Sequence, residues 1–154
     1  MPTWCSRRAG RKDETKEKAM EYKLSFRQYH KALMKNKLMG LSCPRCGAVT
    51  CPPQMSCRSC AAYDLEITEL SGRGKITTFT VITVAPEGRE SEAPYIVVLV
   101  ELEEGPWIMG NLYDLDPSRA DLSLIGRQVE LGCRVYPGDR YSDGPMARPA
   151  FRFV

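Results

Sequence analysis

Four cysteines of the chain stand in two pairs that have the spacing of metal ligands. Cys43 and Cys46 form one C-x-x-C motif, and Cys57 and Cys60 form a second motif after a gap of ten residues. In such a motif a tight turn brings two thiolates to one ion, and two motifs together supply the tetrahedral sulfur set that structural zinc prefers. The spacing therefore predicts one zinc ion per chain, although iron with the same ligands, or disulfides, would also account for paired cysteines.

The predicted metal site is closed, and the rest of the chain offers no catalytic set. Four protein ligands leave no position for a water or a substrate, so the metal is expected to build structure. Cys51 lies outside both motifs and is interpreted as a bystander, Cys133 is interpreted as a core residue, and Cys5 has no assigned role. The single histidine, His30, is interpreted as a packing or surface residue. A nucleophilic cysteine would need a base beside it, so we expect no catalytic residue here.

Composition and cysteine usage are typical of an intracellular globular protein. Hydrophobic residues make up 43% and charged residues 27% of the 154 residues. Seven cysteines are an odd count, and a reducing compartment keeps thiols free for metal binding. No stretch approaches the roughly 18 consecutive apolar residues of a membrane span, and the polar, basic N-terminus lacks the apolar core of a signal peptide. The sequence predicts a cytoplasmic protein without membrane association.

Positive charge is concentrated at the N-terminal end of the chain. Residues 1–45 contain 12 Lys and Arg against 4 Asp and Glu, whereas residues 46–154 contain 10 against 15. An acidic body would repel a phosphate backbone, and binding of nucleic acid requires several Lys or Arg contacts. Nucleic acid is therefore not the expected partner, and a nucleic-acid-binding protein is kept as the alternative.

The pattern of residues 13–37 predicts two short helices after a flexible tail of residues 1–12. A capping box at Ser25 and Gln28, in which both side chains bond backbone amides, marks the start of the second helix, which is expected to reach Lys35. Apolar residues recur along this helix at the spacing of one face, namely Phe26, Tyr29, Leu33 and Met34. Two short helices cannot bury this face alone, so it is expected to pack on the rest of the chain or on another protein.

The remainder of the chain is expected to be mainly β, with a zinc ribbon at residues 38–63 and a barrel domain at residues 64–154. Apolar and β-branched runs predict five strands at residues 72–84, 95–102, 107–112, 129–135 and 150–154. A short helix is expected near residues 118–122, between the third strand and the fourth. Five strands with a helix at that place are the layout of a five-stranded OB-fold barrel.

The core of the barrel is expected to follow the period of two along each strand. In the fourth strand this period predicts that four side chains point inward, namely Val129, Leu131, Cys133 and Val135. Most of the aromatic residues on the strands are also expected in the core, namely Phe79, Tyr95, Trp107, Phe151 and Phe153.

The order of these parts resembles a known family. N-terminal helices, a rubredoxin-like zinc ribbon and a C-terminal OB-fold are the architecture of the acyl-CoA-associated family of small proteins found beside thiolases and related condensing enzymes. The resemblance covers residues 25–154. Its carriers are the aromatic helix of residues 26–35, Cys43-Pro44-Arg45-Cys46-Gly47, Pro52-Pro53, Cys57-Arg58-Ser59-Cys60, Gly74-Lys75-Ile76, Phe79-Thr80-Val81, Pro94-Tyr95 and Phe151-Arg152-Phe153.

The resemblance implies a partner role for the chain. Members of the family sit against a thiolase-fold catalytic subunit, which carries the active-site cysteine and histidine, and they help to hold or cover the coenzyme A thioester. The chain would then be a non-catalytic, zinc-binding subunit of a thiolase complex. If its second helix faces the CoA channel, its aromatic side chains would pack on the pantetheine arm and its cations would approach the phosphates. The residues concerned are Phe26, Arg27, Tyr29, Lys31, Leu33 and Lys35. The alternative is that the apolar face of this helix belongs to the core.

Overall fold

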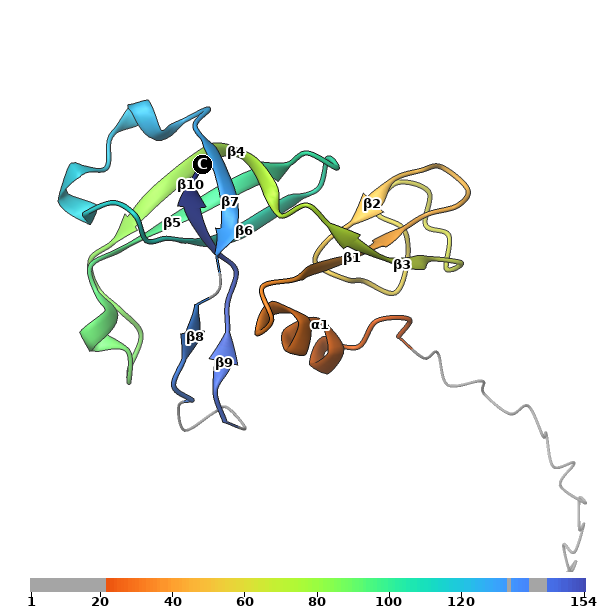
Figure 1. The fold of residues 1–154 in the computed structure, drawn as a ribbon, viewed down its shortest axis with the longest axis horizontal. Coiled ribbons are helices and arrows are strands. Elements are labelled where there is room, and N and C mark those ends of the chain that lie inside the picture. Colours follow the sequence, from red (N-terminus) through yellow and green to blue (C-terminus); the bar gives the residue numbers. More distant parts are fainter. Residues whose placement is uncertain (1–21, 133, 139–143) are drawn as a thin grey trace, which may run out of the picture.

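The protein is mainly β, with a small ribbon module and one helix beside a larger barrel (Figure 1). This computed structural model describes residues 22–132, 134–138 and 144–154. The predicted tail of residues 1–12 and the first predicted helix lie outside the described residues. Within the described ranges, no helix is long and apolar enough to cross a bilayer.

Helix α1 (Phe26–Leu33) begins at the predicted capping box. The Ser25 hydroxyl accepts a hydrogen bond from the Gln28 amide at 3.3 Å, and the Gln28 side chain accepts one from the Ser25 amide at 2.9 Å. The helix ends at Leu33 rather than at Lys35, and the chain then turns through Asn36, whose φ is 59°.

The buried face of α1 is narrower than the sequence predicted. Tyr29 and Leu33 are only 6% and 5% exposed, whereas Phe26 is 71% exposed and Met34 is 37% exposed. Eight residues form only about two turns, so the helix presents two side chains to the core. Phe26 stands outside the core and stacks on His30, with 5.9 Å between the ring centroids.

The ribbon contains a three-stranded antiparallel sheet with the strand order β2-β1-β3. β1 (Leu38–Ser42) pairs with β2 (Val49–Thr50) on one side and with β3 (Glu66–Leu70) on the other, in a register that sets Leu38 opposite Leu70. Helix α1 packs on β1. Because β3 lies within the range assigned to the barrel from the sequence, we propose that the boundary between the two modules falls after β3.

The barrel is closed by five strands in the order β10-β6-β5-β4-β7. Its members are β4 (Arg73–Ile82), β5 (Tyr95–Leu102), β6 (Trp107–Leu112), β7 (Gln128–Gly132) and β10 (Ala150–Phe153). β10 pairs in parallel with β6 and antiparallel with β7, and these pairings close the barrel. The prediction of a five-stranded OB-fold is confirmed.

The barrel core follows the alternation of the strands. Ile96, Val98 and Val100 of β5 are fully buried, as are Val129 of β7 and Phe151 of β10. The inward residues of neighbouring strands thus fill the interior from several sides.

Two side chains that the sequence placed in the core lie outside it, since Trp107 is 50% exposed and Val135 is 46% exposed. Ile108 of β6 is buried, and adjacent residues of a strand point to opposite faces, so Trp107 points outward. Val135 does not belong to β7, because that strand ends at Gly132. Phe79 and Phe153 are partly buried against the core.

The connections of the barrel carry additional short elements. The connection from β4 to β5 contains the 3-10 helix η1 (Glu90–Glu92), and that from β7 to β10 contains a hairpin of β8 (Val135–Tyr136) and β9 (Met146–Ala147). Two 3-10 helices, η2 (Pro117–Arg119) and η3 (Leu122–Leu124), stand where one short helix was expected. The hairpin was not predicted, because the Pro and Gly residues of this segment indicate a loop.

The hairpin contacts helix α1 through the single histidine of the chain. The Nε2 atom of His30 accepts a hydrogen bond from the Ala147 amide at 2.8 Å. Figure 1 shows β8 and β9 extending from the barrel beside α1. His30 is therefore a packing residue, as predicted.

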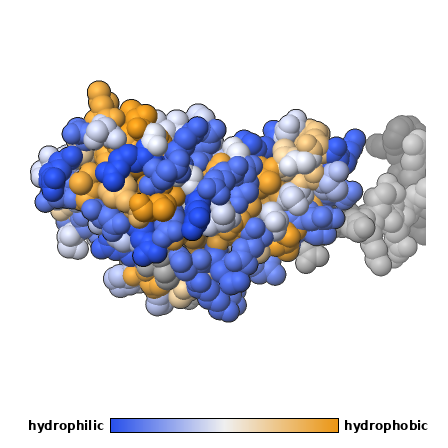
Figure 2. Space-filling view, turned by 45° about the horizontal axis from the view of Figure 1, so that its top comes forward, coloured by the Kyte–Doolittle hydropathy of each residue, from blue (hydrophilic) through white to orange (hydrophobic). Residues whose placement is uncertain are grey.

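The surface mixes polar and apolar side chains. In Figure 2 apolar residues lie among polar ones over both the barrel and the ribbon. Some large apolar side chains are mostly exposed, including Phe26 at 71%, Met109 at 65% and Leu122 at 78%.

Candidate metal centre and apolar groove

The four cysteines of the two motifs converge on one point. Their sulfur atoms all lie within 4.8 Å of one another, with 3.6 Å between Cys43 and Cys60 and 3.6 Å between Cys46 and Cys57. Zinc–sulfur bonds of about 2.3 Å at tetrahedral angles would place the sulfur atoms about 3.8 Å apart. The arrangement therefore fits one tetrahedrally bound zinc ion.

Both halves of the site hold their thiols with the same backbone hydrogen bonds. The Gly47 amide donates to the Cys43 carbonyl at 2.8 Å, and the Ala61 amide donates to the Cys57 carbonyl at 3.0 Å. In each half the amide of the first cysteine also donates to the carbonyl five residues further on, at 2.9 and 2.8 Å. The chain thus uses one turn twice to present two pairs of thiols.

Backbone amides favour the thiolate form of Cys57. The amides of Cys60 and Ser59 bond its sulfur, the latter at 3.4 Å, and they lower the pKa of the Cys57 thiol to about 6. The thiolate is the form that binds a metal ion. Cys43 and Cys57 are buried while Cys46 and Cys60 are exposed, so an ion held by all four would lie at the surface of the ribbon.

Cys51 lies outside this cluster. Its side chain is buried, and its sulfur donates a hydrogen bond to the Met39 carbonyl at 3.7 Å. Burial raises the pKa of the Cys51 thiol to about 12, so the neutral form dominates and the group is a poor nucleophile. Cys5 and Cys133 are outside the described residues, and their expected roles stay predictions.

An apolar groove of about 760 Å³ opens where the helix, the ribbon and the barrel meet. Phe26 and Tyr29 of α1 border it together with Pro52-Pro53 of the ribbon and Met109 of β6. Its volume falls within the roughly 300–1,000 Å³ of small-molecule sites. Three distant segments build the groove, so sequence patterns did not reveal it. Two features of the sequence could have indicated it: the adjacent prolines, and the position of Met109 on the outward face of its strand.

The structure brings together only some of the α1 residues that were assigned to coenzyme A. Phe26, Arg27 and Tyr29 border the groove. Leu33 is buried in the core, and Lys31 and Lys35 are exposed at positions that do not border it. The face of α1 that meets the groove is therefore its first turn.

The Tyr29 hydroxyl is a buried polar group without a hydrogen-bond partner among the described residues. Burial, with Cys51 nearby, raises the pKa of this hydroxyl above its usual range. The ring of Tyr29 thus contributes packing, and its hydroxyl lies beside the Cys51 thiol.

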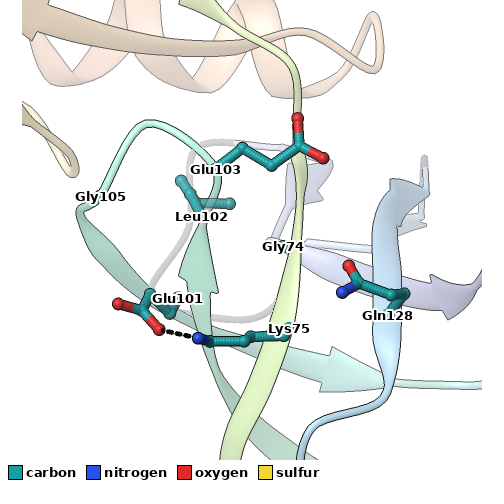
Figure 3. A pocket seen from close by; sticks show the side chains of 7 residues that line it. All are labelled: Gly74, Lys75, Glu101, Leu102, Glu103, Gly105 and Gln128. Carbon is teal, nitrogen blue, oxygen red and sulfur yellow. Dashed lines mark ion pairs between the residues drawn. The ribbon is translucent and has the colours of Figure 1, made fainter.

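Two hydrogen bonds join the ribbon to the barrel at the turn between β5 and β6. The Arg58 guanidinium donates to the Gly105 carbonyl at 3.3 Å, and the Ser71 amide donates to the Glu104 carboxylate at 2.6 Å. A polar pocket of about 300 Å³ lies at the same turn, where Lys75 and Glu101 form an ion pair at 2.9 Å (Figure 3).

Known proteins share this architecture. The family model of the ChsH2 rubredoxin-like zinc ribbon domain matches residues 30–66, and that of the ChsH2 C-terminal OB-fold domain matches residues 68–134. A DUF35 domain-containing scaffold protein of Pyrococcus furiosus is 34% identical over 100 residues, which are 65% of this chain and 71% of that protein. The chain belongs to the DUF35 family. This finding confirms the family resemblance that the sequence showed, with its zinc ribbon and OB-fold.

Two further relatives carry different descriptions. A DUF35 domain-containing scaffold protein of Methanocaldococcus jannaschii is 40% identical over 94 residues, which are 60% of this chain and 64% of that protein. The benzoylsuccinyl-CoA thiolase subunit BbsA of Geobacter metallireducens is 32% identical over 85 residues, 54% of this chain and 56% of that protein. The match thus spans less than two thirds of the length of these two relatives.

A solved structure has the same fold as this DUF35 chain over most of its length. The structure is described as an Ltp2-ChsH2(DUF35) aldolase, and the similarity has a TM-score of 0.61 at 28% sequence identity. It covers 81% of this chain and 91% of the other.

Proposed function

We propose that this DUF35 protein is a non-catalytic, zinc-binding subunit of a thiolase-type acyl-CoA complex. It docks on a thiolase-fold catalytic subunit and helps to hold or cover the acyl-CoA, so that the complex reaches full activity. The observation that carries the proposal is the apolar groove, which helix, ribbon and barrel build together in a relative of a thiolase subunit. We place the complex in the cytoplasm, because a four-cysteine zinc site suits a reducing compartment.

The groove supplies the kind of surface that a pantetheine or acyl chain requires. Its border is mostly apolar, and Phe26 and Met109 stand exposed on it. Arg27 is the cation on the border, and a guanidinium can form charge-assisted hydrogen bonds with a phosphate. Lys31 and Lys35 would meet coenzyme A only where the ligand continues along the exposed side of α1.

The zinc ion has a structural part in this proposal. Pro52-Pro53 lies between the two metal-binding turns and forms one border of the groove. Binding of zinc to the four cysteines would fix both ends of the segment that carries these prolines. Folding of so small a module depends on the free energy of metal binding, so loss of zinc would also remove this border.

In this proposal the chain has no thiolase chemistry of its own. Thiolytic cleavage requires a nucleophilic cysteine with acid–base groups beside it. Cys51 is buried with a raised pKa, and the Nε2 atom of His30 is already bonded to the Ala147 amide. In this proposal the partner therefore supplies the catalytic residues.

A finer proposal concerns the substrate. The relationship to BbsA suggests a thiolase that cleaves 2-benzoylsuccinyl-CoA, in anaerobic toluene breakdown. The aromatic and apolar border of the groove would suit an aryl acyl group, and Phe26 is the exposed ring that could meet it.

A pair of matched variants tests the docking role. Met109→Glu places a charge on the groove, while Leu122→Glu places the same charge on η3, which does not border the groove. Co-purification from the native host would identify the thiolase-fold subunit, and its affinity for each variant would then be measured by calorimetry. We expect Met109→Glu to weaken binding of that subunit at least tenfold and Leu122→Glu to leave it unchanged. Equal affinities for both variants, or no thiolase-fold protein in the co-purified material, would contradict the proposal.

A further inference from the structure

Strand β3 forms an open edge of the ribbon sheet. β1 lies between β2 and β3, so β3 has a neighbouring strand on one side only. All five residues of β3, Glu66–Leu70, pair with β1 in a continuous register without a bulge. Helix α1 packs on β1, and among the described elements no other strand pairs with β3. The second side of β3 is therefore available to another strand.

The backbone of β1 alternates between its two neighbours. The Cys43 amide donates to the Ala48 carbonyl at 2.9 Å, which directs the odd-numbered residues of β1 toward β2. The Met39 carbonyl has the same direction, because it accepts a hydrogen bond at 3.7 Å from the Cys51 thiol, and Cys51 directly follows β2. The even-numbered residues of β1 therefore bond β3.

The same alternation leaves two residues of β3 directed toward the open edge. The register sets Glu66, Thr68 and Leu70 opposite the even-numbered residues of β1, so these three bond β1. Ile67 and Glu69 lie between them and direct their amides and carbonyls the other way. Among the described residues no hydrogen bond uses these four backbone groups. The edge thus offers two amides and two carbonyls to an added strand, as β-augmentation requires.

The side chains of β3 leave this edge accessible and make it acidic. Ile67 is 46% exposed, and the side chain of Glu69, which pairs with Lys37 at 2.9 Å, is 54% exposed. Natural edges are often blocked by lysine, proline, a bulge or a covering element. Residues 61–72 contain three acidic residues and no Lys, Arg or Pro. Two copies of β3 would repel each other at this edge, whereas a basic segment would be attracted.

The N-terminal segment of residues 1–12 has the complementary composition. It contains no Asp or Glu and four basic residues, namely Arg7, Arg8, Arg11 and Lys12. It also contains Trp4. An aromatic side chain and a β-branched one, such as that of Ile67, form a favourable cross-strand pair. Both the charge and the apolar side chain of the segment therefore suit the edge.

This segment can reach the edge within the same chain. Residues 13–21 connect it to Tyr22, which borders the apolar groove together with Pro52-Pro53 of the ribbon. These nine residues can span about 30 Å, and a module the size of residues 38–70 measures about 20 Å across. A segment tethered at such a length has an effective concentration on the order of mM. Binding within one chain is therefore favoured over binding of a second copy at ordinary protein concentrations.

We propose that the open edge of β3 binds the basic N-terminal segment of the same chain as an added strand. The amides and carbonyls of Ile67 and Glu69 bond the backbone of the segment, and the acidic side chains of the edge attract its arginines. The bound segment covers an edge that would otherwise be open to other chains. This inference does not rest on the docking role of the groove.

Hydrogen exchange of individual amides, measured by NMR on the zinc-loaded full chain, tests the inference. The amides of Ile67 and Glu69 should exchange about tenfold or more slowly in the full chain than in a variant that lacks residues 1–12, because only a bound strand protects them. The Thr68 amide, which bonds β1, should be equally protected in both proteins and is the internal control. Addition of a synthetic peptide of residues 1–12 to the shortened variant should restore the protection.

Charge variants of the full chain test the recognition. Arg7→Glu combined with Arg8→Glu should lower the protection of the two edge amides about tenfold or more, because the segment then carries the charge of the edge. Lys16→Glu combined with Lys18→Glu makes the same charge change outside the segment and should leave the protection unchanged. Equal exchange of the edge amides with and without residues 1–12, or equal effects of the two double variants, would overturn the inference. Protection that rises with protein concentration would assign the edge to a second copy and would also overturn it.

Discussion

Gly47 and Ala61 occupy the same position in the two metal-binding turns, and both have positive φ angles, of 73° and 57°. Each follows the second cysteine of its C-x-x-C motif and donates its amide to the carbonyl of the first cysteine. Glycine adopts this conformation readily, whereas alanine is strained in it by about 1–2 kcal/mol. The second turn therefore has a less favourable residue than the first.

Replacing Ala61 by glycine should stabilise the zinc-loaded protein by about 0.5–1 kcal/mol, because relief of the strain exceeds the added entropy of the unfolded chain. Denaturant unfolding would measure the change. Gly47→Ala is the reciprocal variant and should destabilise the protein. A destabilised Ala61→Gly variant would show that the two turns are not equivalent.

The zinc site should bind about one ion per chain and should be needed for folding of the ribbon. Elemental analysis would give the metal content, and circular dichroism after chelation would report loss of structure. Cys57→Ser should lose the metal, whereas Cys51→Ser should keep it, because Cys51 lies outside the cluster. A metal-free protein with an intact ribbon would contradict this prediction.

Tyr29→Phe should leave stability unchanged or raise it by up to about 1 kcal/mol, because the hydroxyl is buried without a partner among the described residues. Tyr29→Ala should instead cost about 3–5 kcal/mol through loss of the buried ring. Thermal unfolding of both variants would separate the two contributions. A loss of more than about 1 kcal/mol in Tyr29→Phe would reveal a hydrogen bond of this hydroxyl that the fold depends on.

Alkaline pH should destabilise the fold through Cys51. Burial raises the pKa of its thiol from 9.0 to about 12, so between these values the folded state binds more protons than the unfolded state. Stability is then lost as pH rises through that window. Cys51→Ala removes this group, and its unfolding free energy should fall less steeply between pH 9 and 11 than that of wild type. Parallel curves for the two proteins would argue against a buried neutral thiol.

Local patterns predicted much of this fold. The capping box at Ser25, the two cysteine motifs and the exact extents of β5 and β6 follow from neighbouring residues, because each is a pattern within a few positions. Trp107 was misplaced because an aromatic residue at the start of a strand does not reveal which face it takes. The β8–β9 hairpin escaped prediction because its strands have only two residues each and β9 is held by contact with α1.

Of the candidate sites, too, only the one formed by residues close in sequence could be predicted. The four metal-binding cysteines are close in sequence, and their spacing alone predicts the cluster. The groove joins Phe26, Pro52 and Met109, which are distant in sequence, so it depends on tertiary structure. Sequence patterns indicated the aromatic face of the helix but not the residues of the ribbon and the barrel that lie beside it.

The central claim is that this chain supports a partner's thiolase reaction without catalysing it. The measurement is CoA-dependent thiolytic cleavage of an acyl-CoA by the small chain alone, by the thiolase-fold subunit alone and by their mixture. The small chain should be inactive, and the mixture should exceed the large subunit alone, because a covered channel excludes water and positions the thioester. Cleavage by the small chain alone, or a large subunit that is equally active without it, would contradict the account.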